Sequence, residues 1–226
     1  MSSAFLGILM LDTQFPRLLG DIGHPQTFAR LGIAVRYRVV QGASPRRAVQ
    51  EADQTLLPLF IEAARALERE GATLISTSCG FLARHQRQLA GAVSVPVISS
   101  SLLQCASLSK PGILTIDADA LDVPTLAAAG VRLGTPMQGV QPGCEFQRRI
   151  LDNDTEMDAA RAEADVVDAA RQLIERHPSV RQIVLECANM PPYRDAVARA
   201  TGRQVHDIVS LLGARWATSI CGASRQ

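Results

Sequence analysis

The chain has 226 residues, of which 47% are hydrophobic and 20% charged, and its formal net charge is +1. This composition allows a packed core and argues against a disordered chain. The balanced charge and the 4% of aromatic residues argue against a nucleic-acid surface. No apolar run reaches the ~18–20 residues that a membrane span needs. We therefore expect a small-molecule partner, no nucleic acid and no membrane.

The chain starts with a short apolar run, LGILMLD (6–12), which predicts a first β-strand. It has neither the positive leader nor the long apolar segment of a signal peptide. The five cysteines are scattered along the chain, at positions 79, 105, 144, 187 and 221. An odd, scattered set without an export signal indicates free thiols in a reducing, cytoplasmic setting. The four histidines are far apart and no Cys/His cluster is present, so we expect no metal site.

Apolar β-branched runs then alternate with amphipathic runs, which is typical of parallel α/β architecture. The strands predicted in the first half are 6–12, 33–41, 72–78 and 95–101. A helix is predicted over 51–70, because apolar residues recur there at helical spacing. Pro58 is expected to kink the first turns of this helix.

After Lys110-Pro111 the pattern starts again, and GILTID (112–117) resembles GILMLD (7–12). The elements predicted in this half are strands at 112–117, 181–187 and 202–209, a helix over 156–176 and a C-terminal helix. Together the two halves predict two similar parallel-sheet lobes.

Three landmarks support an internal repeat. Gly7 and Gly112 are 105 residues apart, Cys79 and Cys187 are 108 apart, and the valines of PVISS and QVHDI are also 108 apart. A nearly constant offset indicates two lobes related by a pseudo-twofold axis. Lobe 1 is predicted to comprise residues 1–105 and the C-terminal segment from about 206 to 226, and lobe 2 residues 106–205. Pockets tend to form between such lobes, at the carboxyl ends of parallel strands.

Cys79 and Cys187 both lie where a strand gives way to a helix, so the repeat predicts them on opposite walls of one cleft. A helix N-terminus stabilises a thiolate, which predicts low thiol pKa values. Gly80 would let a ligand approach closely, and the Asn189 amide would bind a carboxylate. Two opposed thiols suit racemisation next to a carbonyl, since one removes a proton and the other returns one. The other three cysteines are expected to be core fillers.

The segments GILMLD, TQFPRLLGDIGHPQTF, TSCGFLA, VPVISSS, GILTID and LECANMPPY resemble the aspartate/glutamate/hydantoin racemase superfamily. The resemblance covers residues 7 to about 209. It implies two α/β lobes, a cofactor-free mechanism with Cys79 and Cys187 as catalytic pair, and a homo-oligomer. It also implies substrate contacts, which we expect from Asp12, Thr115, Ser78, Gly80, Phe81, Ala188 and Asn189.

The chain departs from many glutamate racemases, because Gly80-Phe81 and Ala188-Asn189 stand where they have Asn-Thr and Thr-His. Phe81 makes the predicted pocket narrower or more apolar than a glutamate site. The leading hypothesis is an aspartate- or glutamate-type amino-acid racemase. Hydantoin racemisation, arylmalonate decarboxylation and maleate isomerisation are alternatives within the superfamily. A small-molecule binding protein and a redox switch with a Cys79–Cys187 disulfide are alternatives outside it.

Four further residues have open roles. Arg17 lies with Asp21 in the Gly/Pro-rich loop after the first strand, where it either binds a distal carboxylate or is solvated. Glu186 is either a surface or edge residue or an influence on Cys187. The pair His206-Asp207 either faces the cleft or packs and caps a helix.

Overall fold

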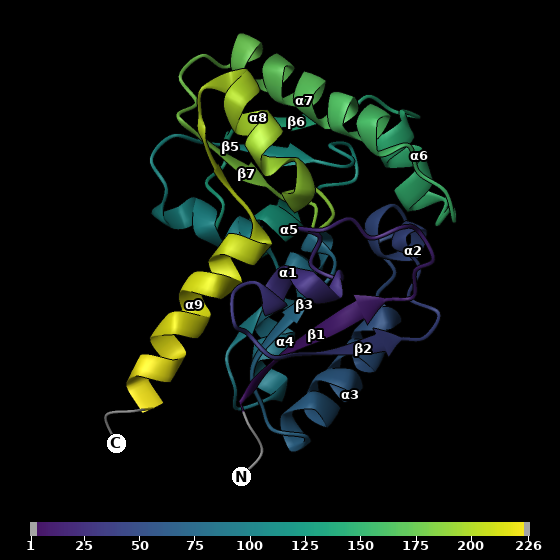
Figure 1. Ribbon diagram of the computed structural model, residues 1–226, viewed down its shortest axis with the longest axis vertical. Coiled ribbons are helices and arrows are strands. Elements are labelled where there is room, and N and C mark those ends of the chain that lie inside the picture. Colours follow the sequence, from purple (N-terminus) through teal and green to yellow (C-terminus); the bar gives the residue numbers. More distant parts are fainter. Residues whose placement is uncertain (1–3, 224–226) are drawn as a thin grey trace.

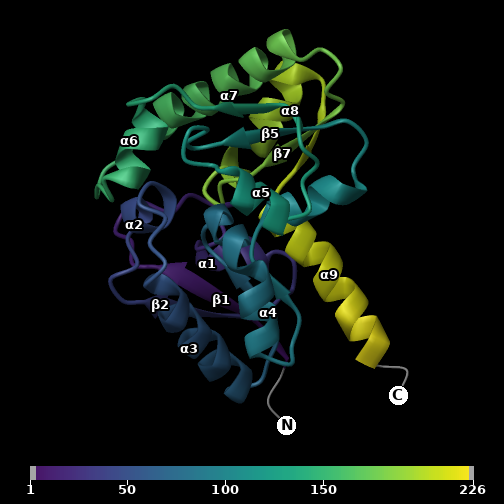
Figure 2. The same ribbon diagram turned by 180° about the vertical axis from the view of Figure 1, so that it is seen from behind.

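The computed structural model describes residues 4–223, with side chains as far as Thr218, so Cys221 lies outside the described side chains. Two lobes are stacked along the long axis of the molecule, and each is built on a four-stranded parallel sheet (Figures 1 and 2). The α/β class with two similar parallel-sheet lobes, predicted from the sequence, is confirmed.

The first lobe has strand order β2-β1-β3-β4. Its elements are β1 (Phe5–Leu11), α1 (Pro25–Ala29), β2 (Val35–Val40), α2 (Pro45–Val49), α3 (Leu56–Arg69), β3 (Ala72–Thr77), the 3₁₀ helix η1 (Gly80–His85), α4 (Gln86–Ala92), β4 (Val97–Ile98) and the 3₁₀ helix η2 (Ser101–Ser107).

The second lobe has the equivalent order β6-β5-β7-β8. Its elements are β5 (Pro111–Thr115), α5 (Val123–Ala128), β6 (Met137–Gly139), α6 (Glu145–Leu151), α7 (Ala159–Arg176), β7 (Gln182–Leu185), the 3₁₀ helix η3 (Pro191–Tyr193), α8 (Arg194–Thr201) and β8 (Gln204–His206). The last helix, α9 (Ile208–Ala223), follows β8.

The two sheets match in register as well as in order. In the first sheet Gly7 pairs with Ile75, which pairs with Val97. In the second, Gly112 pairs with Ile183, which pairs with Val205.

Each of the two glycines in this register also packs against the long helix of its own lobe. An added Cβ would come 2.9 Å from Leu67 of α3 at Gly7, and 3.1 Å from Leu173 of α7 at Gly112. The offsets seen in the sequence therefore correspond to equivalent positions in space.

Strand β1 is buried on both faces, as expected for the interior of a parallel α/β sheet. Phe5, Leu9 and Leu11 belong to the core that contains α3, whereas Leu6, Ile8 and Met10 pack with α1 and α9. Successive side chains of a strand point to opposite faces, so the two sets cover the two sides of the sheet. The chain thus returns from the second lobe to pack α9 along the first (Figure 1).

Several predicted elements have different bounds in the structure, and two of them show a physical reason. The helix expected over 51–70 begins at Leu56, because Asp53 accepts the backbone N–H of Thr55 and holds the preceding residues in a turn. Pro58 therefore lies in the first turn, where its missing N–H removes no helical hydrogen bond. The strand expected over 95–101 is limited to Val97–Ile98, because Ser100 accepts the N–H of Leu102 and starts η2.

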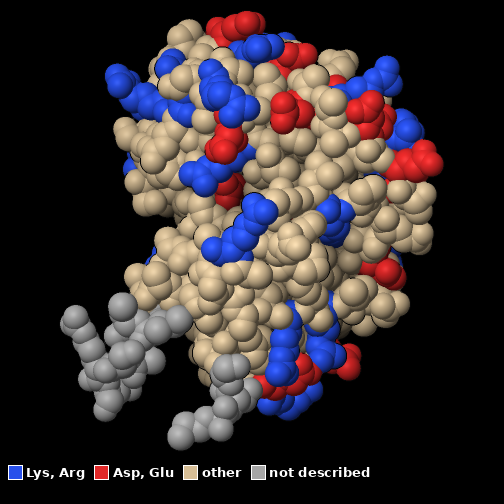
Figure 3. All heavy atoms as spheres, viewed as in Figure 1, with Lys and Arg blue, Asp and Glu red and all other residues tan. Residues whose placement is uncertain are grey.

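On the face seen in Figure 3, acidic and basic side chains are interspersed over both lobes, so this face has no extended region of one sign. Among the described residues, no helix is both long and apolar enough to cross a membrane.

Candidate active site

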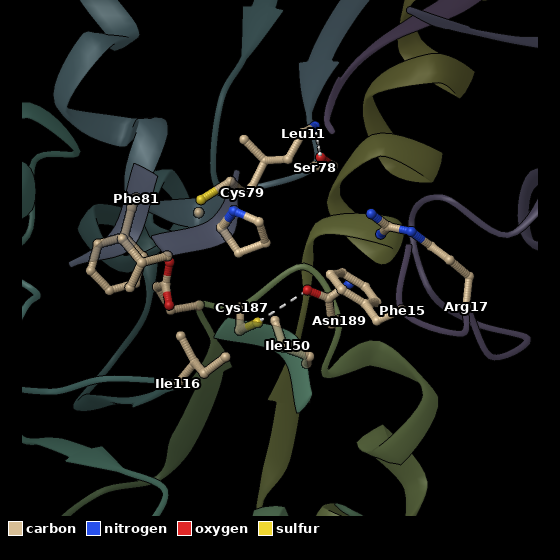
Figure 4. A pocket seen from close by; sticks show the side chains of 14 residues that line it. Leu11, Phe15, Arg17, Ser78, Cys79, Phe81, Ile116, Ile150, Cys187 and Asn189 are labelled. Atoms are coloured by element: carbon tan, nitrogen blue, oxygen red, sulfur yellow. Dashed lines mark hydrogen bonds between the residues drawn. The ribbon is translucent and has the colours of Figure 1, made fainter. Parts of the chain in front are cut away.

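The two cysteines lie in the same pocket between the lobes. Cys79 follows the end of β3 and precedes η1, and Cys187 follows the end of β7. Both are buried, at 5% and 6% exposure, and both line the pocket. Figure 4 shows them entering from opposite sides, with Phe81 and Ile116 to one side and Asn189, Phe15 and Arg17 to the other. Both thiols are free.

The pocket is narrow and mostly apolar. Its free space of about 20 Å³ has room for about one water molecule. Its apolar wall is formed by Leu11, Phe15, Val49, Phe81, Ile116 and Ile150. Its polar lining comes from Arg17, Ser78, Glu186, Asn189 and the two thiols, and any ligand larger than a water molecule requires the pocket to widen.

The low pKa values predicted from the sequence for the two thiols are wrong, because in the structure both pKa values are raised. Burial raises the pKa of Cys79 to about 12, and the nearby Glu186 adds to the rise. Backbone N–H groups of Phe81 and Leu82 oppose it without reversing it. Burial and Glu186 likewise raise the pKa of Cys187 well above its usual value. Desolvation outweighs the helix N-terminus here because η1 is a single short 3₁₀ segment and η3 begins only at Pro191.

Glu186 is neither a surface nor an edge residue, since it is 1% exposed and lines the pocket. Its Oε2 accepts a hydrogen bond from Thr115 at 2.7 Å. Burial raises the pKa of this carboxyl to about 8, against the lowering effect of Thr115. The sequence left the role of Glu186 open, yet this carboxyl is the strongest electrostatic influence on both thiols among neighbouring groups.

Gly80 lines the pocket, and its lack of a side chain leaves space for Glu186. A Cβ built on Gly80 would lie 2.1 Å from Glu186 Oε1 and 2.3 Å from the Glu186 carbonyl oxygen. The sequence contains one sign of this contact. A glycine directly follows Cys79, whereas the equivalent position after Cys187 is Ala188, so the first lobe lacks a side chain at this point.

Asn189 connects Cys187 to the loop after β1. The Cys187 thiol donates to Asn189 Oδ1 at 3.6 Å, and Asn189 Nδ2 donates to Asp21 Oδ2 at 2.6 Å. Arg17 pairs with the other Asp21 oxygen at 2.8 Å and donates to Thr13. Arg17 is therefore not a solvated loop residue; it lines the pocket and lies over the ring of Phe15.

Most of the remaining predicted residues are in or next to the pocket. Ser78 and Phe81 line it, and the Ser78 hydroxyl accepts the N–H of Leu11. Thr115 is buried behind it and contacts Glu186.

Asp12 and Ala188 do not line the pocket. The Asp12 carboxylate accepts the N–H of Gly42 in the turn after β2, and the Ala188 carbonyl accepts the N–H of Ile22. Asp207 caps α9 through Ser210 N, which settles the open role of this residue as a capping one. Among the described residues, no group of three or more His, Cys, Asp or Glu could hold a metal ion.

No family model matches the chain. The chain is 28% identical over 224 residues to the dimethylsulfoniopropionate lyase of Durusdinium sp. clade D, covering 91% of this chain and 72% of the lyase. It is 30% and 29% identical to dimethylsulfoniopropionate lyases 3 and 7 of Emiliania huxleyi, again over 91% of its own length. It spans 57% and 64% of those two proteins.

Solved structures of similar fold share less sequence. Unliganded arylmalonate decarboxylase has a TM-score of 0.54 at 16% identity, covering 96% of this chain and 92% of that one. Glutamate racemase from Thermus thermophilus, in complex with β-chloro-D-alanine, has a TM-score of 0.56 at 16% identity, covering 98% of this chain and 82% of that one. The aspartate racemase homologue PH1733 from Pyrococcus horikoshii has a TM-score of 0.54 at 14% identity, covering 97% of this chain and 99% of that one.

The fold and the paired strand-end cysteines define a two-lobe α/β protein with an interlobe site. This is the fold of the aspartate/glutamate/hydantoin racemase superfamily, as the sequence motifs predict. The relatives named here, in sequence and in structure, include lyases, a decarboxylase and a racemase, which supports an enzyme rather than a binding protein.

Proposed function

We propose that this chain is a cofactor-independent lyase that acts on a small carboxylate. One of the two cysteines removes a proton from the α-carbon, and a leaving group departs from the β-carbon. The first substrate to test is dimethylsulfoniopropionate. The observation that carries the proposal is that Cys79 and Cys187 line one narrow, mostly apolar pocket between the lobes.

The elimination balances without a cofactor. A thiolate accepts the α-proton of dimethylsulfoniopropionate, and the electrons of the C–H bond form the new carbon–carbon double bond. The bond from the β-carbon to sulfur breaks, and its electron pair leaves with sulfur as dimethyl sulfide. Acrylate remains, and the proton on the thiol returns to solvent. A carboxylate next to the α-carbon favours proton removal when its negative charge is offset by hydrogen bonds.

The thiol pKa values favour a substrate with a positive charge. Because burial raises the pKa of Cys79 to about 12, Cys79 is a neutral thiol at neutral pH. A sulfonium group next to the pair would stabilise a thiolate and lower its pKa. A dicarboxylate such as aspartate would add negative charge beside Glu186. The thiolate formed beside the sulfonium would then be the base that removes the α-proton.

The sequence comparison supports the same choice. The similarity to dimethylsulfoniopropionate lyases extends over 91–92% of this chain at 27–30% identity. The likeness to racemases is one of fold, at 14–16% identity. Because the chain is shorter than these lyases, their activity is a proposal for it.

Amino-acid racemisation is the second candidate, with aspartate and glutamate as substrates. It is favoured by one observation: the thiols enter the pocket from opposite lobes, as acid and base on the two faces of one carbon would. The elimination needs only one base, so it gives no reason for the second thiol.

One experiment separates the candidates. Purified protein is incubated in D₂O with dimethylsulfoniopropionate, with both enantiomers of aspartate and glutamate, and with a 5-substituted hydantoin, and proton NMR is recorded. New vinyl signals of acrylate would support the lyase. Loss of the α-hydrogen signal of an amino acid or hydantoin, without new vinyl signals, would support a racemase and overturn the lyase proposal.

A further inference from the structure

Glu186 differs from the other buried carboxylates of the described chain. Asp21 pairs with Arg17, and Asp207 accepts the N–H of Ser210 and lies 3.6 Å from Arg194. Glu186 is as deeply buried as these two, yet its Oε1 has no hydrogen-bond partner. An ionised carboxylate without a cationic partner is costly to bury, so Glu186 retains its proton at neutral pH and would ionise when a cation arrives with a ligand.

The surroundings of Glu186 supply hydrogen bonding to one oxygen only. Thr115 donates to Oε2 at 2.7 Å, while Oε1 is buried and lies 2.1 Å from the place that a Cβ on Gly80 would take. Arg17, which lines the pocket, is engaged with Asp21 and Thr13, and Arg84 of η1 is engaged with Asp122 and Thr125. The site therefore has an unpaired acid and no free cation among the residues that line it.

We propose that Glu186 receives the positively charged end of the substrate, an onium group on a small carboxylate. The inference rests on the proposed function and refines its substrate class. An alkylated onium group combines one positive charge with apolar methyl groups. The charge would pair with the Glu186 carboxylate, and the methyl groups would contact Phe81, Ile116 and Leu11, which line the same pocket. The face of the Phe81 ring adds a further favourable contact for a cation.

Binding of a cation would be coupled to ionisation. The pKa of Glu186 is about 8 in the empty site because of burial. A cation beside the carboxylate lowers that pKa, so binding at pH 7 releases a proton and the affinity rises with pH up to about 8.

The other titratable or charged groups near Glu186 do not explain such a release. They are Cys79 and Cys187, which interact with Glu186, Arg17, which lines the same pocket, Arg84 of η1, and Asp117, whose backbone N–H donates to Thr115. Burial keeps the two thiols protonated at pH 7, and a fall in their pKa from such high values would release little at that pH.

Three isosteric carboxylates provide the test. They share one shape and differ in the group that carries the two methyls: dimethylsulfoniopropionate, 3-(dimethylammonio)propanoate and the neutral 4-methylpentanoate. The last two have no leaving group comparable to a sulfonium, so their binding is measured by calorimetry in two buffers of different ionisation enthalpy. Turnover of the sulfonium compound is measured by acrylate NMR, which distinguishes a sulfonium from an ammonium substrate.

We expect wild-type protein to bind the ammonium compound at least about tenfold more tightly than the neutral one, with proton release at pH 7. Glu186→Gln keeps the shape and the Thr115 hydrogen bond, and should remove both the preference and the proton release while leaving the neutral compound bound. Equal affinities for the two compounds in wild type would overturn the inference, and so would a preference that survives in Glu186→Gln.

The outcomes for the two proposals are distinct. If acrylate forms but the preference for the ammonium compound over the neutral one does not depend on Glu186, only the onium inference is contradicted. If the protein neither binds any of the three carboxylates nor forms acrylate, both the proposed function and the onium inference are contradicted. If Glu186→Gln does not fold, the wild-type preference and proton release still decide the question.

Discussion

Asn189 and Asp21 join the two lobes across the pocket, with Asn189 Nδ2 donating to Asp21 Oδ2 at 2.6 Å. The same Asp21 carboxylate pairs with Arg17 at 2.8 Å, and Asn189 Oδ1 accepts from the Cys187 thiol. One carboxylate that is 2% exposed therefore fixes the position of a pocket arginine and of the amide next to the Cys187 thiol.

Replacing Asp21 should affect both stability and activity. Asp21→Ala leaves Arg17 without its ion-pair partner and frees the Asn189 amide, so we expect a loss of about 2–4 kcal/mol in the free energy of unfolding. Turnover of the substrate should fall by about 10²-fold because the groups around Cys187 are misplaced. Urea denaturation and the acrylate assay measure the two effects. Asp168→Ala, in an exposed pair with Arg171, is the control and should change stability by less than about 0.5 kcal/mol. Equal effects of the two substitutions would contradict this role of Asp21.

The two cysteines should differ in importance if the reaction is an elimination. Substitution by serine of the thiol that acts as base should lower kcat by about 10²–10⁴-fold, and the other substitution should cost less. Cys105→Ser is the matched control, because Cys105 is buried but does not line the pocket. Circular dichroism verifies the fold of each variant. Complete loss in both Cys79→Ser and Cys187→Ser, with exchange of an α-hydrogen in wild type, would fit a racemase instead.

Alkylation of Cys79 should be slow at neutral pH. Because the pKa of Cys79 is about 12, its thiolate fraction rises about tenfold per pH unit between pH 7 and pH 10. The rate of modification by iodoacetamide, followed by mass spectrometry of the labelled peptide, should rise in the same proportion. A rate that is already maximal at pH 8 would show that the thiol is activated in the free protein.

The contact between Gly80 and Glu186 predicts a severe effect of one methyl group. Gly80→Ala would bring a Cβ to 2.1 Å from the Glu186 carboxylate and 2.3 Å from its carbonyl oxygen, so the segment must shift. We expect a loss of about 1–3 kcal/mol or more from overpacking, together with loss of activity. Gly91→Ala in α4 meets nothing within 4 Å and should be neutral or stabilising by up to about 1 kcal/mol. Thermal unfolding of both variants measures the difference, and similar Tm values would refute the close contact.

Glu186 should also make stability depend on pH. Its pKa is raised from 4.5 to about 8 in the folded protein, so the native state binds this proton more tightly than the unfolded chain does. Its contribution to stability is therefore present below about pH 4.5 and is lost as the pH rises toward 8. The stability of wild type relative to Glu186→Gln should fall across this window and level off above it. Urea denaturation of both proteins at pH 5, 6.5 and 8 tests this, and a constant difference would contradict it.

Much of the fold follows from local patterns in the sequence. Alternating apolar and amphipathic segments predict parallel α/β lobes, and the offset of 108 between Cys79 and Cys187 predicts their equivalent places after β3 and β7. The bounds of α3 and β4 were less predictable, because side chains in the preceding turns, such as that of Asp53, decide where an element begins.

The chemistry of the site depends on packing that no local pattern contains. The thiol pKa values are set by burial, and burial depends on how the two lobes close around Cys79 and Cys187. Glu186 directly follows the apolar strand β7, at a place where a charged residue is usually exposed. It is buried because Gly80, from the other lobe, leaves room for it. Contacts between residues more than a hundred positions apart create this acid.

The return of α9 to the first lobe has a consequence for the order of folding. The residues of β1 that face α9, Leu6, Ile8 and Met10, are synthesised some two hundred residues before Leu212 and Trp216, which cover them. During translation the whole second lobe emerges between the two events. The face of the first sheet that α9 covers therefore stays exposed while the second lobe can already fold. At this stage the nascent chain is most exposed to aggregation and most in need of a chaperone.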